Sequence, residues 1–345
     1  MYKTFGIILI AGIITVSMLS LNRHPDSKLV EIGVDDWAVE NVLSNLGGKA
    51  YNHTIKQADP EKVKIGEQLI LNGRSKNHGK KGKLISIHFV CTDCHNLVKE
   101  TENPANLSPE DRLDYAIKNK IKFLPGSTLW GIYNRRHWYN EDYVKKYGDI
   151  IKNAKDSLTQ AVQVCAKYCS SGRFLENWEL EAIMHYFKQQ ELKIRDLPLS
   201  LETKRQITNW KELEEDQRKA LRETIESSFT TAFPATFMET MPRDNRKYGQ
   251  GFDAERGEKI FESSCLYCHA NKRVTYLHLE KNRITANMFW NNVTDYNDLT
   301  LYQIIRWGTY MKVGRKQYMP HYTKEKMSDR QIEDLVAYIR KLAKK

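Results

Sequence analysis

The chain has 345 residues and a formal net charge of +11, and 41% of its residues are hydrophobic. A chain of this length suits two small domains joined by connecting arms. Its lysines are spread over several segments, with Lys80, Lys81 and Lys83 in one and Lys341 and Lys344 in another. This spread indicates a solvated surface rather than a nucleic-acid interface, although it also suits attraction to an acidic redox protein or a small anion. The sequence shows no phosphate-binding loop, Ser-His-Asp triad or usefully spaced carboxylate pair.

The first 21 residues predict an export signal. Lys3 precedes an apolar run over residues 5–21, and a polar stretch follows at once. The run is 17 residues long, the short limit for a membrane span, and it lacks a clear small-residue cleavage site. We therefore expect a periplasmic or other extracytoplasmic protein, with residues 1–21 either cleaved or retained as a membrane anchor. Residues 22–58 follow as an N-terminal arm, with an apolar helix expected over 37–46.

A first helix is expected to begin at Asp59 and Pro60. Asp is a favoured N-cap residue, and Pro suits the first helical turn. Gly66 lies inside this helix, where its small size would let another helix cross closely. Residues 74–90 then follow, rich in Lys and Gly, and they predict a surface loop.

Residues 91–95 read Cys-Thr-Asp-Cys-His, and residues 265–269 read Cys-Leu-Tyr-Cys-His. Both match Cys-x-x-Cys-His, the attachment signature of a c-type haem. The two thiols can add to the two vinyl groups of one porphyrin, and the adjacent His can bind the iron. A zinc knuckle, a disulfide or a thioredoxin-like site would leave that His without a role. We therefore expect two covalently bound haem c groups, attached through Cys91, Cys94, Cys265 and Cys268, with His95 and His269 as iron ligands.

The second motif has a helix on each side. Residues 253–261 predict a helix capped by Asp253 that leads into the motif, and residues 328–339 predict an amphipathic closing helix. Met319 is the favoured second iron ligand here, because Pro320 follows it and it lies nine residues before the closing helix. Met311 is the reserve candidate.

An internal repeat with an offset of 152 places residues 176–187 over residues 328–339. The same offset places Lys167 at the position of Met319, with Cys165 and Cys169 two residues to either side. Four interpretations of this slot compete. Cys169 or Cys165 binds iron as a thiolate, the two cysteines form a disulfide, Lys167 binds iron, or His137 does.

Residues 59–195 and 251–345 each resemble the class I c-type cytochromes. The resemblance rests on an N-terminal helix, the haem motif and a closing helix, and residues 318–322 are similar to the distal-ligand loop of that family. Residues 129–135 are similar to its segment that packs below the haem. The resemblance implies a mostly α fold of two tandem cytochrome c-like domains, 59–195 for haem 1 and 251–345 for haem 2. Residues 196–250 would form a helical connector that packs the two domains together, and the helix over 37–46 could cover a haem edge.

His/Met ligation would make haem 2 a high-potential electron-transfer centre, whereas a thiolate would lower the potential of haem 1. We therefore expect a dihaem cytochrome that carries electrons between a redox-protein donor and acceptor. Domain 1 is also similar in its cysteine to the Cys-ligated haem domains of thiosulfate dehydrogenases and thiosulfate-oxidising complexes. This similarity implies an alternative, an oxidoreductase acting on a small sulfur anion, with Cys169 or Cys165 as ligand or covalent carrier. The anion would be held by Lys167, Arg135, Arg136 or Arg173. A haem-based sensor or docking subunit is a third possibility, so whether the protein is an enzyme is left open.

Overall fold

The computed structural model describes residues 33–344 except for residues 78, 271–273, 294–299 and 309–318. The protein is 54% helical, and its described strands form one two-stranded hairpin, so the predicted mostly α fold is confirmed. The predicted export segment over 1–21 and the reserve ligand Met311 lie outside the described residues. Within the part of the chain that the structure describes, no helix has the length and apolar character to cross a membrane.

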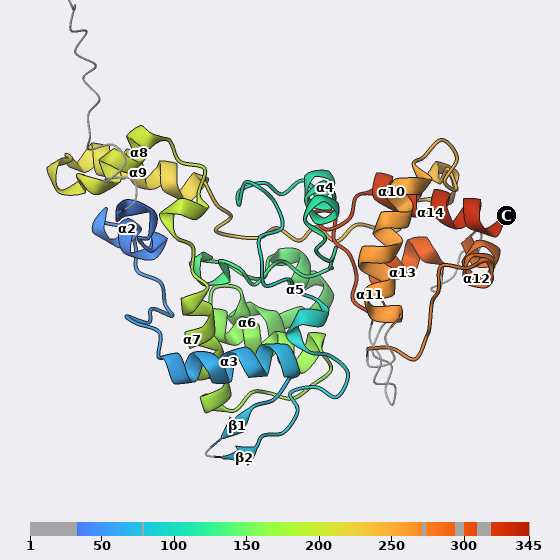
Figure 1. Cartoon of the computed structure of the whole chain (residues 1–345), viewed down its shortest axis with the longest axis horizontal. Coiled ribbons are helices and arrows are strands. Elements are labelled where there is room, and N and C mark those ends of the chain that lie inside the picture. Colours follow the sequence, from blue (N-terminus) through green and yellow to red (C-terminus); the bar gives the residue numbers. More distant parts are fainter. Residues whose placement is uncertain (1–32, 78, 271–273, 294–299, 309–318, 345) are drawn as a thin grey trace, which may run out of the picture.

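The helices form three groups along the long axis of the molecule (Figure 1). The group at one end holds the N-terminal arm and the connector helices, the central group carries the first haem motif, and the group at the other end carries the second. Short 3₁₀ and π-helical turns join several of the helices.

The central group is built on a crossing of α3 (Pro60–Asn72) and α7 (Asn177–Gln189). The Asp59 carboxylate caps α3 as predicted, accepting a hydrogen bond from the Glu61 amide at 2.8 Å. At the crossing, a Cβ added to Gly66 would overlap the carbonyl group of Ala182, so this position needs glycine. The other elements of the group are β1 (Lys76–Asn77), β2 (Lys80–Lys81), α4 (Pro109–Asn119), α5 (Glu141–Tyr147) and α6 (Leu158–Val164).

The third group repeats this crossing with α10 (Ala254–Ile260) and α14 (Asp329–Ala343). The Asp253 carboxylate caps α10, as predicted, and a Cβ added to Gly257 would overlap the carbonyl group of Asp334. A π-helical turn over Phe261–Cys265 then leads into the second motif. The remaining elements are α11 (Leu266–His269), α12 (Arg283–Val293) and α13 (Leu301–Trp307).

The N-terminal arm and the connector helices form a small apolar core of their own. The helix expected over 37–46 is α2 (Val39–Asn45), which packs against α8 (Leu201–Thr208) and α9 (Glu215–Ser227). The expectation that this helix covers a haem edge is wrong, because its apolar residues are consumed by that core and none lines the pocket at the first motif.

The extended part of the connector, rather than its helices, reaches the third group. The Ala235 carbonyl accepts a hydrogen bond from the Asn140 side chain at 2.9 Å. The next residue, Thr236, donates through its hydroxyl to Glu325 at 2.6 Å. The connector therefore contacts both motif-bearing groups through backbone and short polar side chains.

The two motif-bearing groups also share a core at α4. Leu113, Ala116 and Phe123 follow the first motif in the chain, yet they pack among the core residues of α10 and α14. The buried Phe123 backbone donates to the Ser263 carbonyl at 3.1 Å and accepts from the Ser264 hydroxyl at 2.7 Å. The start of the second motif is thus fixed against the chain that follows the first.

We predict that Gly257→Ala lowers the free energy of unfolding by about 1–3 kcal/mol, the usual cost of overpacking a close contact. The added methyl group would force α10 away from α14 at Asp334. Thermal unfolding followed by circular dichroism measures the change. Gly33→Ala is the matched control, since a Cβ at Gly33 meets nothing within 4 Å. An equal melting temperature for both variants would contradict the prediction.

Candidate functional site

The first motif begins in a 3₁₀ turn over Cys91–Asp93. The Asp93 side chain is fully buried and accepts a hydrogen bond from the Val90 amide at 2.7 Å, which fixes the entry of the chain into the turn. His95 follows, and its Nδ1 donates to the Ser127 carbonyl oxygen at 2.6 Å. That bond leaves Nε2 available to bind a haem iron. Burial lowers the pKa of His95, which favours the neutral imidazole that binds metals.

Gly126 allows the close packing behind this imidazole. A Cβ at Gly126 would lie 2.5 Å from Nδ1 of His95 and 2.6 Å from the Cys94 carbonyl oxygen. Its amide donates to that same carbonyl at 2.9 Å. The segment over 125–127 therefore sets the orientation of the ring.

A large pocket opens beside the motif. Its empty space is about 1550 Å³ including the mouth, and Cys91, Cys94 and His95 all line it. The rest of its wall is mainly apolar, with Leu69, Phe89, Leu129, Ile183 and Phe187 among the lining residues. The residues present therefore fit a covalently attached haem.

Cys165 and Cys169 line the same pocket. They stand at the two ends of a π-helical turn that continues α6, so both side chains reach the cavity. In the structure no disulfide joins them. The structure thus brings the two spare cysteines of the sequence to the pocket of the first motif.

The surroundings of Cys169 favour its thiolate. Hydrogen bonding from Cys165 lowers the pKa of Cys169, burial opposes this, and Tyr139 and the Lys146 ammonium lower it further. The pKa of Cys165 is raised, first by its hydrogen bond to Cys169 and then by burial. These contacts therefore favour the thiolate at Cys169 rather than at Cys165, with Cys165 and Tyr139 as donors to it.

The two other distal-ligand candidates lie elsewhere. The Lys167 ammonium lies 5.8 Å from the centre of the Phe174 ring, and the half-exposed His137 is paired with Asp156 at 2.5 Å. Neither lines the pocket. We therefore set both candidates aside.

Among the four cations expected to hold an anion, Arg135 lines the pocket. Arg136 instead pairs with Glu226 at 3.4 Å and donates to the Lys49 carbonyl. Arg173 pairs with the buried Glu179 at 2.6 Å.

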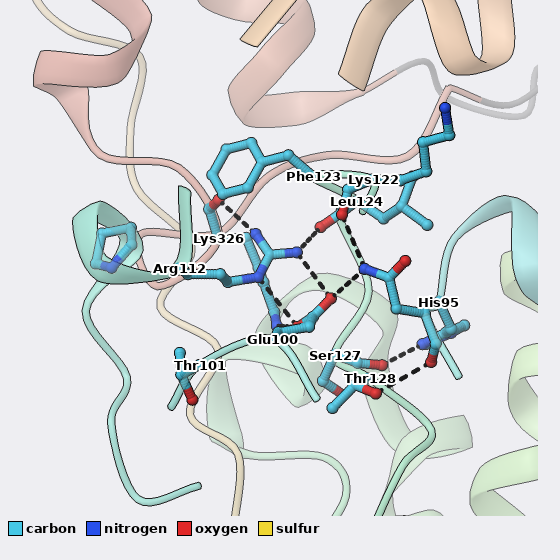
Figure 2. Close-up of polar contacts among 12 residues, drawn as sticks. His95, Glu100, Thr101, Arg112, Lys122, Phe123, Leu124, Ser127, Thr128 and Lys326 are labelled. Atoms are coloured by element: carbon cyan, nitrogen blue, oxygen red, sulfur yellow. Dashed lines mark hydrogen bonds and ion pairs between the residues drawn. The ribbon is translucent and has the colours of Figure 1, made fainter. Parts of the chain in front are cut away.

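A buried charged cluster at the pocket wall could not be recognised from the sequence. Figure 2 shows Glu100 bound by Arg112 and by Lys326, at 3.0 and 3.4 Å. Arg135 lies nearby and donates to the Ser127 hydroxyl at 2.9 Å. Lys326 and Arg135 both line the pocket and are 3% and 5% exposed. The cluster carries two more positive than negative charges, so an anionic group such as a haem propionate fits beside it.

Burial shifts the pKa values of the charged groups in this cluster. It lowers the pKa of Lys326 to about 7 and that of Arg135 to about 10, with Glu100 opposing both shifts. Burial alone would raise the pKa of Glu100, but Arg112 and Lys326 lower it to about 2. Glu100 is thus ionised at every physiological pH, whereas the charge of Lys326 depends on an anion in the pocket.

The second motif has the same proximal arrangement as the first. His269 ends α11 and its Nδ1 donates to the Leu277 carbonyl at 2.9 Å, which again leaves Nε2 for iron. Burial lowers the pKa of His269. Met319 is half-buried beside Gly308, and the segment just before it lies outside the described residues. Its role as an iron ligand stays a prediction.

The chain that follows Met319 reaches the other site. Pro320, His321, Thr323 and Lys326 all line the pocket of the first motif. The predicted distal loop of the second haem therefore forms part of the wall around the first. Among the described residues, no group of three or more His, Cys, Asp or Glu side chains forms a separate metal site.

Residues 252–339 match the family model for cytochrome c oxidase, cbb3-type, subunit III. The match supports a c-type cytochrome. It spans α10 to α14 with the second motif, so this part of the chain is a cytochrome c domain, with a covalently bound haem and an electron-transfer role. Domains of this family are typically extracytoplasmic and have redox proteins as partners. Residues 91–95 lie outside the match, and the chain matches no curated protein and no solved structure.

We predict that Lys326→Met lowers the reduction potential of the first site by about 50 mV, or roughly 1 kcal/mol for one electron. Removing a cation from the pocket wall favours the more positive ferric state. Because the pKa of Lys326 is about 7, the difference should be larger at pH 6, where Lys326 is charged, than at pH 8, where it is largely neutral.

Spectroelectrochemical titration measures this change. Lys324→Met is the matched control, because Lys324 is exposed two residues away. Equal potentials for the two variants at pH 6 would show that Lys326 does not act on the first site.

Proposed function

We propose that this chain is an extracytoplasmic dihaem c-type cytochrome that transfers electrons between a redox-protein donor and acceptor. Residues 91–95 and residues 265–269 each attach one haem c. Each bound haem supplies a one-electron Fe(III)/Fe(II) couple. The observation that carries the proposal is direct contact between the two attachment motifs.

This contact joins residues of the two Cys-x-x-Cys-His segments. The Tyr267 hydroxyl donates to the Thr92 carbonyl at 2.8 Å, and Sγ of Cys268 lies 3.9 Å from the Asp93 carbonyl oxygen. The ammonium of Lys122, which follows α4, lies 5.2 Å from the centre of the Tyr267 ring. Two attachment sites held side by side suit electron exchange within one chain.

The ligands support a direction for that exchange. A thiolate from Cys169 with His95 would stabilise the ferric state at the first site, whereas Met319 with His269 would raise the potential of the second. Electrons would then enter at the low-potential first site and leave from the second.

A second candidate function is the oxidation of a small sulfur anion such as thiosulfate. The Cys165 and Cys169 thiols share one pocket with the Arg135 and Lys326 cations, which supplies both a sulfur-reactive group and positive charge. In this reaction two thiosulfate ions would join through a new S–S bond to give tetrathionate. The two electrons released would pass singly to a cytochrome acceptor.

We predict two covalent haems in the mature chain. Pyridine haemochrome absorbance with intact mass should give two haems per chain for the wild type. Cys91→Ala with Cys94→Ala should leave one, and so should Cys265→Ala with Cys268→Ala. Cys165→Ala is the control and should keep two. A wild-type chain with one haem would overturn the dihaem proposal.

We predict that Cys169→Ala abolishes the low-spin thiolate signal of the ferric first site in electron paramagnetic resonance, because the iron loses that ligand. Cys165→Ala should keep the thiolate signal, since Cys165 acts as a hydrogen-bond donor. The opposite pattern would make Cys165 the ligand.

Steady-state turnover with thiosulfate and oxidised cytochrome c separates the two candidate functions. Turnover in the wild type that is lost in Cys169→Ala would favour the sulfur oxidoreductase. A thiosulfate-inactive wild type with the thiolate signal intact supports the electron carrier.

A further inference from the structure

The segment between α3 and the first motif is strongly basic. No Asp or Glu occurs between Glu67 and Asp93, whereas five cations do. They are Arg74, Lys76, Lys80, Lys81 and Lys83.

These cations are not neutralised by the surrounding fold. Lys76, Lys80, Lys81 and Lys83 are exposed, and in the described part of the chain none of the five forms an ion pair. Lys281 in the other motif-bearing group shows the contrast, because it pairs with Glu258 at 2.7 Å and with Glu262 at 2.5 Å. The segment thus presents uncompensated positive charge to solvent.

Exposed apolar side chains lie within this segment and at the end of α3 that precedes it. Leu71 is 40% exposed, Leu84 37% and Ile87 67%. We call these three residues, with Arg74, Lys76, Lys80, Lys81 and Lys83, the basic hairpin surface. Exposed apolar side chains accompanied by charges of one sign are typical of surfaces that bind another protein.

The fold holds this surface rigidly in place. The Arg173 guanidinium donates to the Lys83 and Leu84 carbonyls at 2.9 and 3.1 Å, and its amide donates to Ile85 at 2.9 Å. The Ser86 hydroxyl donates to the Ser170 carbonyl at 2.6 Å, next to Cys169. A preformed surface loses little conformational entropy when a partner binds.

The surface is also very close to the first site. Ile85, Phe89 and Val90 line the pocket, and Ile85 follows the exposed Leu84 directly. In Figure 1 the hairpin of β1 and β2 projects beyond α3 at the edge of the molecule, where a partner can approach it.

We propose that the basic hairpin surface docks an acidic redox protein that donates electrons at the first site. The proposal rests on the electron-transfer function proposed above and adds the place and the charge of the partner. Its charge complementarity argues against two other occupants. A second copy of this chain would bring like charges together. Nucleic acid would leave Leu84 and Ile87 without an apolar contact.

The test uses the full holoprotein and a reduced plant-type ferredoxin as an acidic one-electron donor. One electron leaves the ferredoxin cluster and one ferric iron of the protein becomes ferrous, with no atom or proton transferred. Stopped-flow spectroscopy at low salt gives the second-order rate constant. Lys80→Glu, Lys81→Glu and Lys83→Glu together should lower this constant at least about tenfold and flatten its salt dependence, because steering supplies a factor of 10 to 10³.

The matched control reverses three exposed lysines elsewhere, Lys56→Glu, Lys219→Glu and Lys341→Glu, and changes the net charge by the same amount. It should lower the rate constant less than about threefold, because distant charges are screened by salt. Ile87→Ser adds a test without a charge change. It should weaken the ferredoxin complex several-fold while leaving the salt dependence as in the wild type.

Equal rate constants for the two triple variants would overturn the proposal, because net charge alone would then explain the effect. Loss of binding to phosphatidylserine vesicles in the hairpin variant, with unchanged ferredoxin kinetics, would assign the surface to a membrane instead. Loss of a wild-type dimer in sedimentation would assign it to a second copy. If excess dithionite reduces both irons equally in every variant, equal ferredoxin rate constants would overturn only the docking proposal. A chain that dithionite cannot reduce removes the proposed function itself.

Discussion

The buried carboxylate of Glu100 links the parts of this molecule that must stay in register. It accepts hydrogen bonds from Asn96, the residue after His95 of the first motif, and from Arg112 on α4. It also pairs with Lys326 from the other motif-bearing group. Arg112 in turn donates to the Leu124 and Lys326 carbonyls, so one charged cluster joins three segments distant in sequence. Removing one member of such a cluster typically costs about 3–5 kcal/mol, because an unpaired charge stays buried. The cluster therefore specifies one arrangement of the two sites more than it adds stability.

That arrangement gives the two motifs the same proximal side and different distal sides. Both His rings donate through Nδ1 to a backbone carbonyl, of Ser127 in one case and Leu277 in the other. On the distal side the first site has a thiol that hydrogen bonds favour as thiolate. A common proximal ligand with unlike distal groups is a direct way for one fold to separate two potentials.

Local patterns in the sequence predicted the features that depend on local chemistry. The caps at Asp59 and Asp253 and the close crossing at Gly66 are confirmed, because each follows from the size or bonding preference of a single residue. The repeat offset of 152 placed Cys165 and Cys169 opposite Met319, and in the structure both cysteines line the pocket of the first motif.

The features that the sequence did not reveal depend on tertiary packing. Glu100 and Lys326 are 226 residues apart, and no spacing rule connects two charges at that separation. The position of α4 in the core of the other group has the same origin, since an apolar helix face does not show which core it joins. The N-terminal helix was misplaced because an apolar face reveals that a helix is covered but not by which partner. The helices that cover it are α8 and α9 of the connector. From the sequence, the connector was expected instead to pack the two haem domains together.

The segment over 74–90 shows how an insertion can give two related sites different partners. It occurs before the first motif and is absent before the second, where α10 runs almost directly into Cys265. Its backbone is fixed by Arg173 and its inner residues complete the pocket wall, so it extends the first site to the surface. The second site reaches the first through Tyr267 and Cys268 on its own motif. With the donor docked at the basic hairpin surface as proposed, an electron would meet the first site before the second, and the contact between the motifs would provide a route onward. With the proposed thiolate ligand at the first site and the proposed methionine ligand at the second, that order of transfer would be energetically downhill.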